Sequence, residues 1–181
     1  MWMNKIKSIN AISPVLEVKN LWKVFPKGQR SKGKKTLNID VHDHVTISQM
    51  EKDGKLVVAV RDVSFEIYPG EIFIVMGLSG SGKSTLIRCL MRLIEITAGT
   101  IKINNLDITS LSKKELVKHR RYQAAMVFQH YGLLPHKTVL DNVAFGLKLR
   151  GEPKEERYQK ARAAIERVGL KGWENYYPAA L

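Results

Sequence analysis

Cysteine is almost absent from this chain: Cys89 is the single one in 181 residues. It cannot form an internal disulfide, and its apolar neighbours predict a small buried side chain in a reducing compartment such as the cytosol. Long apolar runs are also absent, because the longest ones, 56–60 and 72–76, are far too short to span a bilayer. Residues 1–13 contain no apolar run of signal-peptide length. We therefore expect any membrane role to depend on a partner protein.

Acidic residues are scarce, with 17 Asp and Glu against 30 Lys and Arg and a formal net charge of +13. Such a charge raises nucleic acid or an anionic lipid surface as a partner. The basic residues fall in three blocks, 27–35, 113–121 and 148–171, and the last block is interleaved with glutamates. No aromatic-rich binding signature accompanies them, so we expect solvated helix faces and no nucleic acid. A basic nucleic-acid-binding module is the alternative.

The length and the hydrophobic content of 44% fit a single domain over residues 1–181, and the pattern indicates the α/β class. Apolar and polar residues alternate at 16–25, 63–67 and 101–103, which predicts half-buried strands. The continuous apolar run 72–76 predicts a strand buried on both faces, and 126–128 predicts a short strand. Residues 26–55 lack a pattern and are interpreted as an insertion or a long surface loop. The chain contains no internal repeat and no low-complexity tract.

Helical spacing of apolar residues and capping signals predict the helices of the chain. Ser112 and Glu115 form a capping box, and Thr138 is an N-cap candidate. Glycines close the last two helices. The predicted helices cover 86–93, 112–121, 138–151 and 153–169.

Residues 77–85 fit the phosphate-binding loop pattern G-x-x-x-x-G-K-[ST], for which a chance match in this chain has a probability of roughly 1%. The loop follows a predicted buried strand and opens a helix, so its backbone N–H groups can point at a polyphosphate. The alternative is a flexible Gly/Ser linker, which requires neither the strand before it nor a lysine at that position. The predicted ligand-binding residues are Gly77, Leu78, Ser79, Gly80, Ser81, Gly82, Lys83, Ser84 and Thr85.

Each residue type in this loop has a physical task. The glycines let the backbone approach phosphate oxygens, and Lys83 supplies a compact charge for the outer phosphates. Ser84 places a hydroxyl where Mg²⁺ bridging the phosphates can use it. Amide bonds to a charged group contribute about 1.5–3 kcal/mol each, against about 0.3–1 kcal/mol from the helix dipole. The converging amides therefore dominate, and the ligand we expect is a nucleotide triphosphate with Mg²⁺.

The stretch 77–93, together with Gln129 and the helical segment beyond it, resembles the nucleotide-binding domain of ABC transporters. The resemblance covers nearly the whole chain. It implies an ABC-type P-loop NTPase fold with an N-terminal antiparallel β subdomain and a P-loop core in residues 1–129. The insertion 26–55 lies within this part, and residues 130–181 begin a helical subdomain. The implied ligands are ATP and Mg²⁺.

The same resemblance implies roles for residues outside the loop. Gln129 matches the glutamine that reaches Mg²⁺ and the attacking water, which makes it the candidate catalytic residue and, with Ser84, a metal ligand. Phe25 matches the aromatic ring that stacks on adenine, whereas the residues alone favour a core position. Residues Tyr131 to His136 match the surface that contacts the membrane-embedded permease subunit. An ordinary loop with Leu133–Pro135 packed inward is the alternative.

The implied mechanism is ATP bound between two such subunits, whose closure and hydrolysis drive transport by the permease. The insertion and the amino-acid sequence of 133–151 most resemble those of the ATPases of glycine betaine, proline and related quaternary-amine importers. The subunit would then lie in the cytoplasm, peripheral on the inner face of the membrane. A different P-loop enzyme, such as a small-molecule kinase, is a further alternative that Gln129 disfavours. His42–His44 is interpreted as surface sequence and not as a metal site.

A full domain of this family continues with a Leu-Ser-Gly-Gly-Gln signature, an apolar strand ending in Asp-Glu, and a switch histidine. None of these is present, and residues 176–181 resemble the lead-in to the signature. The resemblance therefore predicts a truncated domain without its C-terminal half. Two expectations follow: negligible ATP hydrolysis, since the catalytic glutamate is missing, and an unstable isolated chain, since strand 72–76 would lack a neighbour.

Overall fold

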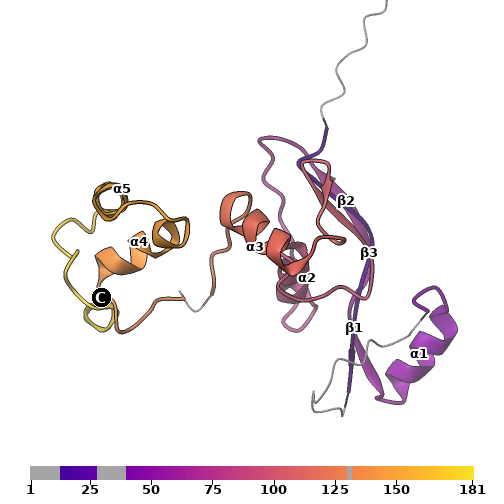
Figure 1. The fold of residues 1–181 in the computed structure, drawn as a ribbon. Helices are drawn as coiled ribbons and strands as arrows, with labels where there is room; N and C mark the ends of the chain where they lie inside the picture. Colours follow the sequence, from indigo (N-terminus) through magenta and orange to yellow (C-terminus); the bar gives the residue numbers. More distant parts are fainter. Residues whose placement is uncertain (1–12, 28–39, 130–131) are drawn as a thin grey trace, which may run out of the picture. The chain divides into compact units, whose positions relative to one another are not determined.

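The computed structural model describes residues 13–27, 40–129 and 132–181. The chain forms two compact units, one ending at Leu116 and one beginning at Val117. The boundary falls within helix α3 (Lys113–Tyr122), and each unit is described by itself (Figure 1). The predicted subdomain division at residues 129 and 130 stays a prediction.

The first unit, called unit 1 below, is built on a four-stranded antiparallel sheet with the strand order β2-β1-β3-β4. β1 pairs on both sides, so that Val18 lies opposite Phe65 on β2 and Ile101 on β3. This sheet confirms the predicted N-terminal antiparallel β subdomain. The strands are β1 (Leu16–Pro26), β2 (Leu56–Ile67), β3 (Ala98–Ile103) and β4 (Leu106–Asp107).

Helix α2 (Lys83–Leu90) packs on one face of this sheet. Its buried residues Leu86 and Cys89 contact Val18, Leu21 and Ile101 in the main core of unit 1. The apolar residues of α2 recur at helical spacing and lie on one side of the helix, while alternate residues of the strands lie on one face of the sheet. These two apolar surfaces can therefore pack against each other. Cys89 is fully buried, as predicted, and burial raises the pKa of its thiol.

Helix α1 (His44–Lys52) lies in the stretch that was predicted to be an insertion or a long surface loop, and for these residues the loop prediction is wrong. The Asp43 side chain caps the helix by accepting a hydrogen bond from Thr46 N at 2.9 Å. Ile47 and Val41 are buried against Trp22 of β1. Figure 1 shows α1 on the opposite side of the sheet from α2. Packing on the sheet thus stabilises a helix whose own sequence is largely polar. Residues 28–39 of the insertion lie outside the described residues.

The predicted capping box opens α3. Ser112 N donates to Glu115 Oε2 at 2.8 Å, and Glu115 N donates to Ser112 Oγ at 3.4 Å. These two bonds satisfy amides that the first turn of a helix leaves without a partner. Hydrogen bonds from Ser112 lower the pKa of Glu115. The prediction for this helix start is confirmed.

The second unit, called unit 2 below, contains α4 (Val139–Leu149), α5 (Lys154–Arg167) and the short 3₁₀ helix η1 (Pro178–Ala180). Thr138 caps α4, since its Oγ1 accepts from Asp141 N at 3.2 Å, as predicted. The first two amides of α4, those of Val139 and Leu140, donate to the carbonyls of Tyr176 and Glu174 at 2.8 and 3.0 Å. The core of unit 2 consists of Val139, Leu140, Ala144, Ala161 and Ile165.

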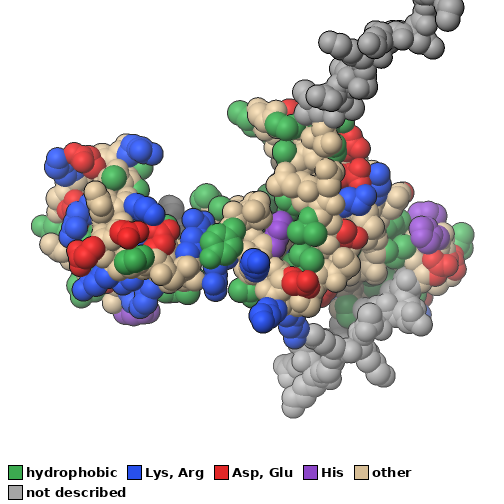
Figure 2. All heavy atoms as spheres, turned by 45° about the horizontal axis from the view of Figure 1, so that its top comes forward, with side chains coloured by type: hydrophobic (Ala, Val, Ile, Leu, Met, Phe, Trp, Pro, Cys, Tyr) green, Lys and Arg blue, Asp and Glu red, His purple; other side chains and the backbone are tan. Residues whose placement is uncertain are grey.

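Charged side chains cover the helices of unit 2. Figure 2 shows Lys and Arg interspersed with Asp and Glu over this unit. Examples are the ion pairs Lys160–Glu152 at 2.7 Å and Lys171–Glu166 at 2.6 Å. The block 148–171 therefore forms solvated faces, in agreement with its interleaved sequence. Among the helices of the described ranges, none has the length and apolar character that crossing a lipid bilayer requires.

Candidate functional site

The predicted phosphate loop is a turn that leads directly into α2. Ser81 N donates to Leu78 O at 3.2 Å, and Leu86 N donates to Gly82 O at 2.8 Å. Gly80 and Gly82 have φ angles of 80° and 89°, in the left-handed region that favours glycine. The turn and the helix of the prediction are both present, with Gly82 as the N-cap residue of α2.

A bulge in β2 holds this loop against the sheet. Lys23 pairs with Val60 and Val24 pairs with Val58, so Ala59 between them has no partner on β1. A Cβ atom at position 82 would lie 2.0 Å from the carbonyl oxygen of Ala59. No side chain fits in this space, so the contact requires glycine at position 82.

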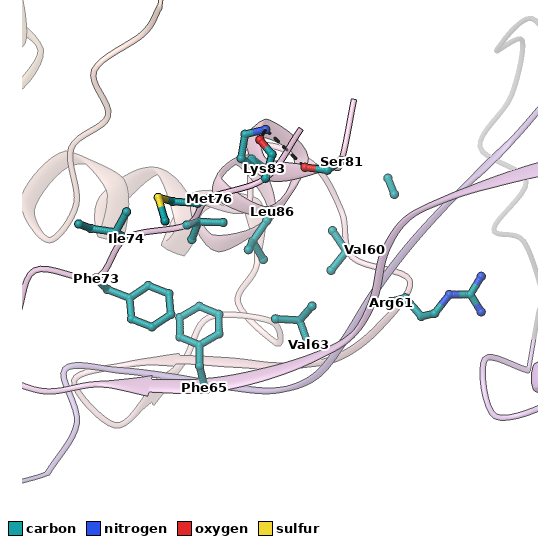
Figure 3. Close-up of a pocket in the computed structure, with 14 residues that line it drawn as sticks. Val60, Arg61, Val63, Phe65, Phe73, Ile74, Met76, Ser81, Lys83 and Leu86 are labelled. Carbon is teal, nitrogen blue, oxygen red and sulfur yellow. Dashed lines mark hydrogen bonds between the residues drawn. The ribbon is translucent and has the colours of Figure 1, made fainter. Parts of the chain in front are cut away.

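The ammonium of Lys83 lies inside the loop. Its Nζ donates to Gly77 O at 2.8 Å and to Leu78 O at 2.6 Å. Ser81 Oγ lies further away, at 3.4 Å (Figure 3). These three partners are neutral, so they leave the positive charge of Lys83 uncompensated. An anion that enters the loop would therefore find a cation beside the N-terminus of α2.

Phe25 and the loop line the same cavity, which has a volume of about 450 Å³. Phe25 is half-buried and belongs to none of the hydrophobic core clusters that the described residues form. The structure therefore brings together an aromatic ring, a series of loop amides and the hydroxyls of Ser84 and Thr85. The lining residues are Phe25, Val57, Val58, Ala59, Gly80, Ser81, Gly82, Lys83, Ser84 and Thr85.

The segment 72–76 before the loop differs from the prediction, which was a strand buried on both faces. It forms no strand, and Ile72 and Met76 are 90% and 86% exposed. A strand needs a neighbour for its N–H and C=O groups, and no strand of the described residues pairs with this segment. Within this segment, the Phe73 ring stacks on the Phe65 ring of β2, with the ring centroids 4.6 Å apart. A cavity of about 490 Å³, lined mainly by apolar side chains, lies between the segment, β2 and α2 (Figure 3).

The predicted strand 126–128 is likewise absent. Val127 is 96% exposed and Phe128 is 47% exposed, because no strand of the described residues pairs with them. Gln129, which follows, is exposed and belongs to unit 2, whereas the phosphate loop belongs to unit 1. The role of Gln129 in Mg²⁺ and water binding stays a prediction.

The predicted permease contact, Tyr131 to His136, is described from residue 132 onward, and Tyr131 lies outside the described residues. Leu133 is 46% exposed, so this leucine does not pack inward as the alternative interpretation required. The Asn142 side chain fixes the segment: its Oδ1 accepts from Leu134 N at 2.8 Å. Its Nδ2 donates to the carbonyls of Leu134, Lys137 and Thr138 at 3.1, 3.0 and 2.9 Å. The segment is therefore tied to α4 while Leu133 points outward.

His42–His44 has a structural use. Asp43 is the N-cap of α1, and hydrogen bonds from Thr46 lower the pKa of its carboxyl. The His44 ring lies 5.5 Å from the Trp22 ring. Within residues 13–27, 40–129 and 132–181, no three His, Cys, Asp or Glu side chains gather as ligands for a metal ion.

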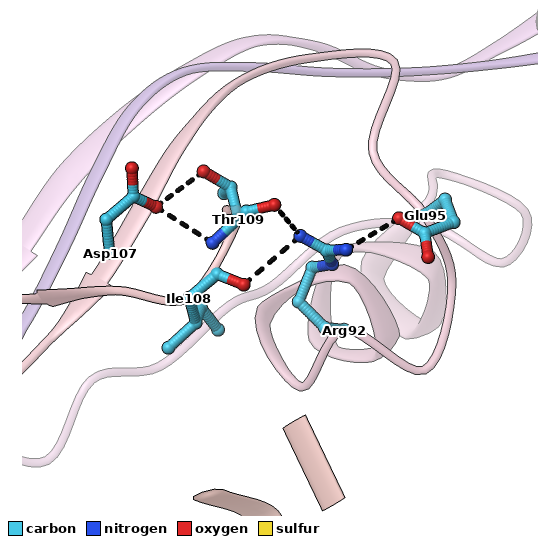
Figure 4. A network of polar contacts seen from close by, with 5 residues as sticks. All are labelled: Arg92, Glu95, Asp107, Ile108 and Thr109. Atoms are coloured by element: carbon cyan, nitrogen blue, oxygen red, sulfur yellow. Dashed lines mark hydrogen bonds and ion pairs between the residues drawn. The ribbon is translucent and has the colours of Figure 1, made fainter. Parts of the chain in front are cut away.

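Arg92 fixes the C-terminal end of α2. Its Nη1 donates to the carbonyls of Ile108 and Thr109, and its Nη2 pairs with Glu95 at 2.7 Å (Figure 4). Thr109 N in turn donates to Asp107 Oδ1 at 2.8 Å. The Arg92 side chain is only 7% exposed, so its bonds to the two carbonyls are partly shielded from water, whereas the Glu95 side chain is 72% exposed. The network ties the end of the loop helix to the segment after β4.

Lys23 is a residue of this site that sequence reasoning missed. Its Nζ lies over the Phe25 ring, 4.5 Å from the centroid, and burial lowers the pKa of this ammonium. The sequence did contain a signal for it. Side chains alternate between the two faces of β1, so Lys23 lies on the same face as the core residue Leu21 and Phe25.

Comparison with known proteins gives the context of this geometry. The model of the family described as "ABC transporter" matches residues 60–179. The trimethylamine N-oxide transport system ATP-binding protein TmoW of Ruegeria pomeroyi is 47% identical over 93% of this chain and 48% of its own length. The glycine betaine/proline betaine transport system ATP-binding protein ProV of Escherichia coli is 45% identical over 92% of this chain and 40% of its own length. The chain thus spans about half the length of the curated relatives it matches, or less.

A solved structure has a similar fold. The dimeric, post-hydrolysis structure of the ATP-binding cassette MJ0796 bound to ADP and Pi aligns with a TM-score of 0.72 and 28% sequence identity. The alignment covers 92% of this chain and 62% of the cassette. The predicted fold class, with its antiparallel sheet and its loop helix, is confirmed.

Proposed function

This chain belongs to the ABC transporter family, and from that premise we propose that it binds MgATP and energises the uptake of a small osmolyte. The observation that supports ATP binding best is the shared cavity of Phe25 and residues 80–85, which borders both an aromatic ring and the loop amides. A purine base can stack on the ring while the phosphates reach the amides and the Lys83 ammonium.

Lys83 and Ser84 would bind the phosphate end of ATP. The Lys83 ammonium exchanges the carbonyls of Gly77 and Leu78 for phosphate oxygens, which offer full negative charge in place of partial charge. Mg²⁺ prefers oxygen ligands and usually retains waters, so one hydroxyl from Ser84 and the side-chain oxygen of Gln129 suit it. When bound, Mg²⁺ would be held by Ser84 and Gln129 and would supply positive charge that offsets the charge of the phosphates.

The transported solute is proposed from the relatives. The names of two of them state transport of trimethylamine N-oxide and of glycine betaine and proline betaine. The Bacillus subtilis relative OpuAA, 53% identical over 68% of this chain and 30% of its own length, is named for glycine betaine transport. We therefore propose a small methylated osmolyte of the betaine class, with proline as a further candidate.

Two protein partners follow from the same proposal. A second copy of the subunit completes the ATP site, and a permease subunit binds near residues 131–136. The outward-facing Leu133, on a segment fixed by Asn142, supports such a contact. The subunit then lies in the cytoplasm, on the inner face of the membrane.

The chain alone is proposed to hydrolyse ATP at a negligible rate. Among the residues that the structure describes, no Asp or Glu lines the cavity of Phe25 and the loop. A carboxylate that polarises the attacking water is the usual base in this reaction class. A phosphate-release assay on the purified chain tests this, and robust turnover that Lys83→Ala abolishes would refute it.

Calorimetric titration of MgATP into the full chain tests the central proposal. We expect Lys83→Ala to weaken binding at least about tenfold, because a charge-assisted bond contributes about 1.5–3 kcal/mol. The matched control is Lys55→Ala, since Lys55 is 64% exposed and pairs with Asp53 at 2.9 Å. Equal affinities of wild type and Lys83→Ala would contradict ATP binding at this loop. A parallel, salt-dependent oligonucleotide titration tests the nucleic-acid alternative.

A further inference from the structure

Lys23 is an unusual residue for its place in β1. The neighbouring positions on the same face are Leu21, which is fully buried, and Phe25, which borders the cavity beside the loop. A half-buried ammonium has lost part of its hydration, and this loss costs free energy unless a partner compensates it. Burial accordingly lowers the pKa of Lys23. A residue that breaks the local pattern in this way points to a site.

An aromatic ring lies against this ammonium, which the Glu95 carboxylate also attracts without forming an ion pair with it. Within the described ranges, no ion pair or hydrogen bond involves the Lys23 side chain, and Lys23 Nζ lies over the Phe25 ring at 4.5 Å from its centroid. Cations within about 6 Å of a ring centroid are attracted by the ring quadrupole, more strongly when they are desolvated. The Lys23 ammonium and one face of the Phe25 ring therefore hold each other in place.

The same ring also borders the cavity beside the loop. Phe25 lines the cavity of about 450 Å³ together with residues 80–85, whereas Lys23 is not among the lining residues. Lys23 thus supports the ring without reaching into the space where a ligand would bind. Ala59 and Gly82 also line the cavity, and the Ala59 carbonyl at the bulge lies against Gly82.

We propose that Lys23 is a positioning residue for the purine base: its ammonium holds one face of Phe25, so that the other face is presented to the base of the bound nucleotide. This inference rests on the proposed function. A ring that is ordered before binding needs no further ordering when the base stacks on it, and this preorganisation raises affinity. Lys23 then contributes to recognition of the base, and the loop contributes to recognition of the phosphates.

Two ligands separate these contributions: MgATP, and inorganic triphosphate with Mg²⁺, which has no base. Calorimetric titrations use the full chain as wild type, Lys23→Met, Lys23→Arg, Phe25→Leu and the double variant Lys23→Met with Phe25→Leu. We expect Lys23→Met to weaken ATP binding about three- to tenfold, the range of a partly desolvated cation–π contact. It should leave triphosphate binding unchanged, and Lys23→Arg should keep the ATP affinity. The double variant should bind ATP no more weakly than Phe25→Leu alone.

Lys19→Met is the matched control, because Lys19 is on the same strand, is 56% exposed and pairs with Glu17 at 3.1 Å. It should bind both ligands as wild type does. Circular dichroism checks that each variant is folded, and Lys23→Gln replaces Lys23→Met if the latter is not. Equal losses for both ligands, additive effects of the two substitutions, or unchanged ATP binding by Lys23→Met would each overturn the inference. In those outcomes wild type still binds ATP, whereas a wild type that binds neither ligand refutes the proposed function and this inference with it.

Discussion

Apolar residues occur on both sides of the phosphate loop, yet the two sides differ in structure. Before the loop, 72–76 forms no strand, and Ile72 is 90% exposed. After the loop, α2 forms at once and places Leu86 and Cys89 in the core at 7% and 0% exposure. One short turn separates the two segments. They differ because a strand and a helix need different partners for their backbone hydrogen bonds.

A helix closes its hydrogen bonds within one segment, whereas a strand depends on a neighbour. α2 needs only a surface to cover, and the sheet of β1, β2 and β3 provides it. The segment 72–76 needs a pairing strand, which no described segment supplies. The same contrast occurs in unit 2, where α4 and α5 form a core of their own while 126–128 is not a strand.

The largest expected effect contrasts two truncations, one on each side of the loop. Leu86→Ala should lower the free energy of unfolding by about 2–5 kcal/mol, because it opens a cavity in the core of unit 1. Ile72→Ala should change it by less than about 0.5 kcal/mol, because this side chain is already exposed. Urea denaturation followed by circular dichroism measures both. A large loss for Ile72→Ala would show that 72–76 is buried in solution, and the comparison would fail.

Proline substitutions test the backbone of the same two segments. Ile87 and Val75 are matched in exposure at 41% and 36%, so the side-chain loss is similar. Ile87→Pro should cost about 3 kcal/mol or more, since it removes a hydrogen bond inside α2 and clashes with the preceding turn. Val75→Pro should cost far less, because 72–76 has no ladder of bonds to interrupt. Thermal unfolding measures the two shifts, and equal shifts would contradict the absence of a strand at 72–76.

The sequence predicted those elements whose signals are local. The N-cap Thr138, the capping box of Ser112 and Glu115 and the glycines of the loop act within a few residues, and each is found where it was predicted. The alternation of β1, β2 and β3 was equally clear. The predictions of strands at 72–76 and 126–128 were wrong. An apolar run indicates that a segment is buried, whereas strand formation also needs a neighbouring strand from elsewhere in the chain.

Helix α1 and the site residue Lys23 were missed for a related reason. Asp43 is an N-cap signal, but the helix after it contributes one fully buried residue, Ile47, and packs on Trp22 of a distant strand. Tertiary packing, which no local pattern shows, stabilises this helix. Lys23 could not be assigned to the site from the sequence in the same way. Its contact with Phe25 becomes relevant to the site only because the fold places the loop beside that ring.

A smaller effect is expected at the start of α4, where helix formation again depends on a local bond. Thr138→Ala should cost about 1 kcal/mol of unfolding free energy, the usual contribution of an N-cap side chain. Thr138→Ser keeps the hydroxyl that accepts from Asp141 N and is the matched control. Urea denaturation compares the two variants. A loss for Thr138→Ser as large as that for Thr138→Ala would mean that the methyl group, and not the cap, stabilises this end of the helix.

The smallest expected effect is the pH dependence of the capping box of α3. The folded pKa of Glu115 is lowered by hydrogen bonds from Ser112, so its contribution to stability is present above the unfolded pKa of about 4.3 and is lost as pH falls through the folded value. Glu115→Gln cannot titrate, so the stability difference between wild type and this variant should shrink between pH 6 and pH 3. Urea denaturation of both proteins at each pH measures it, and the other carboxyls cancel in the difference. A difference that stays constant or grows on acidification would show that Glu115 acts on α3 without its charge, and the start of this helix would then depend on contacts beyond its first turn.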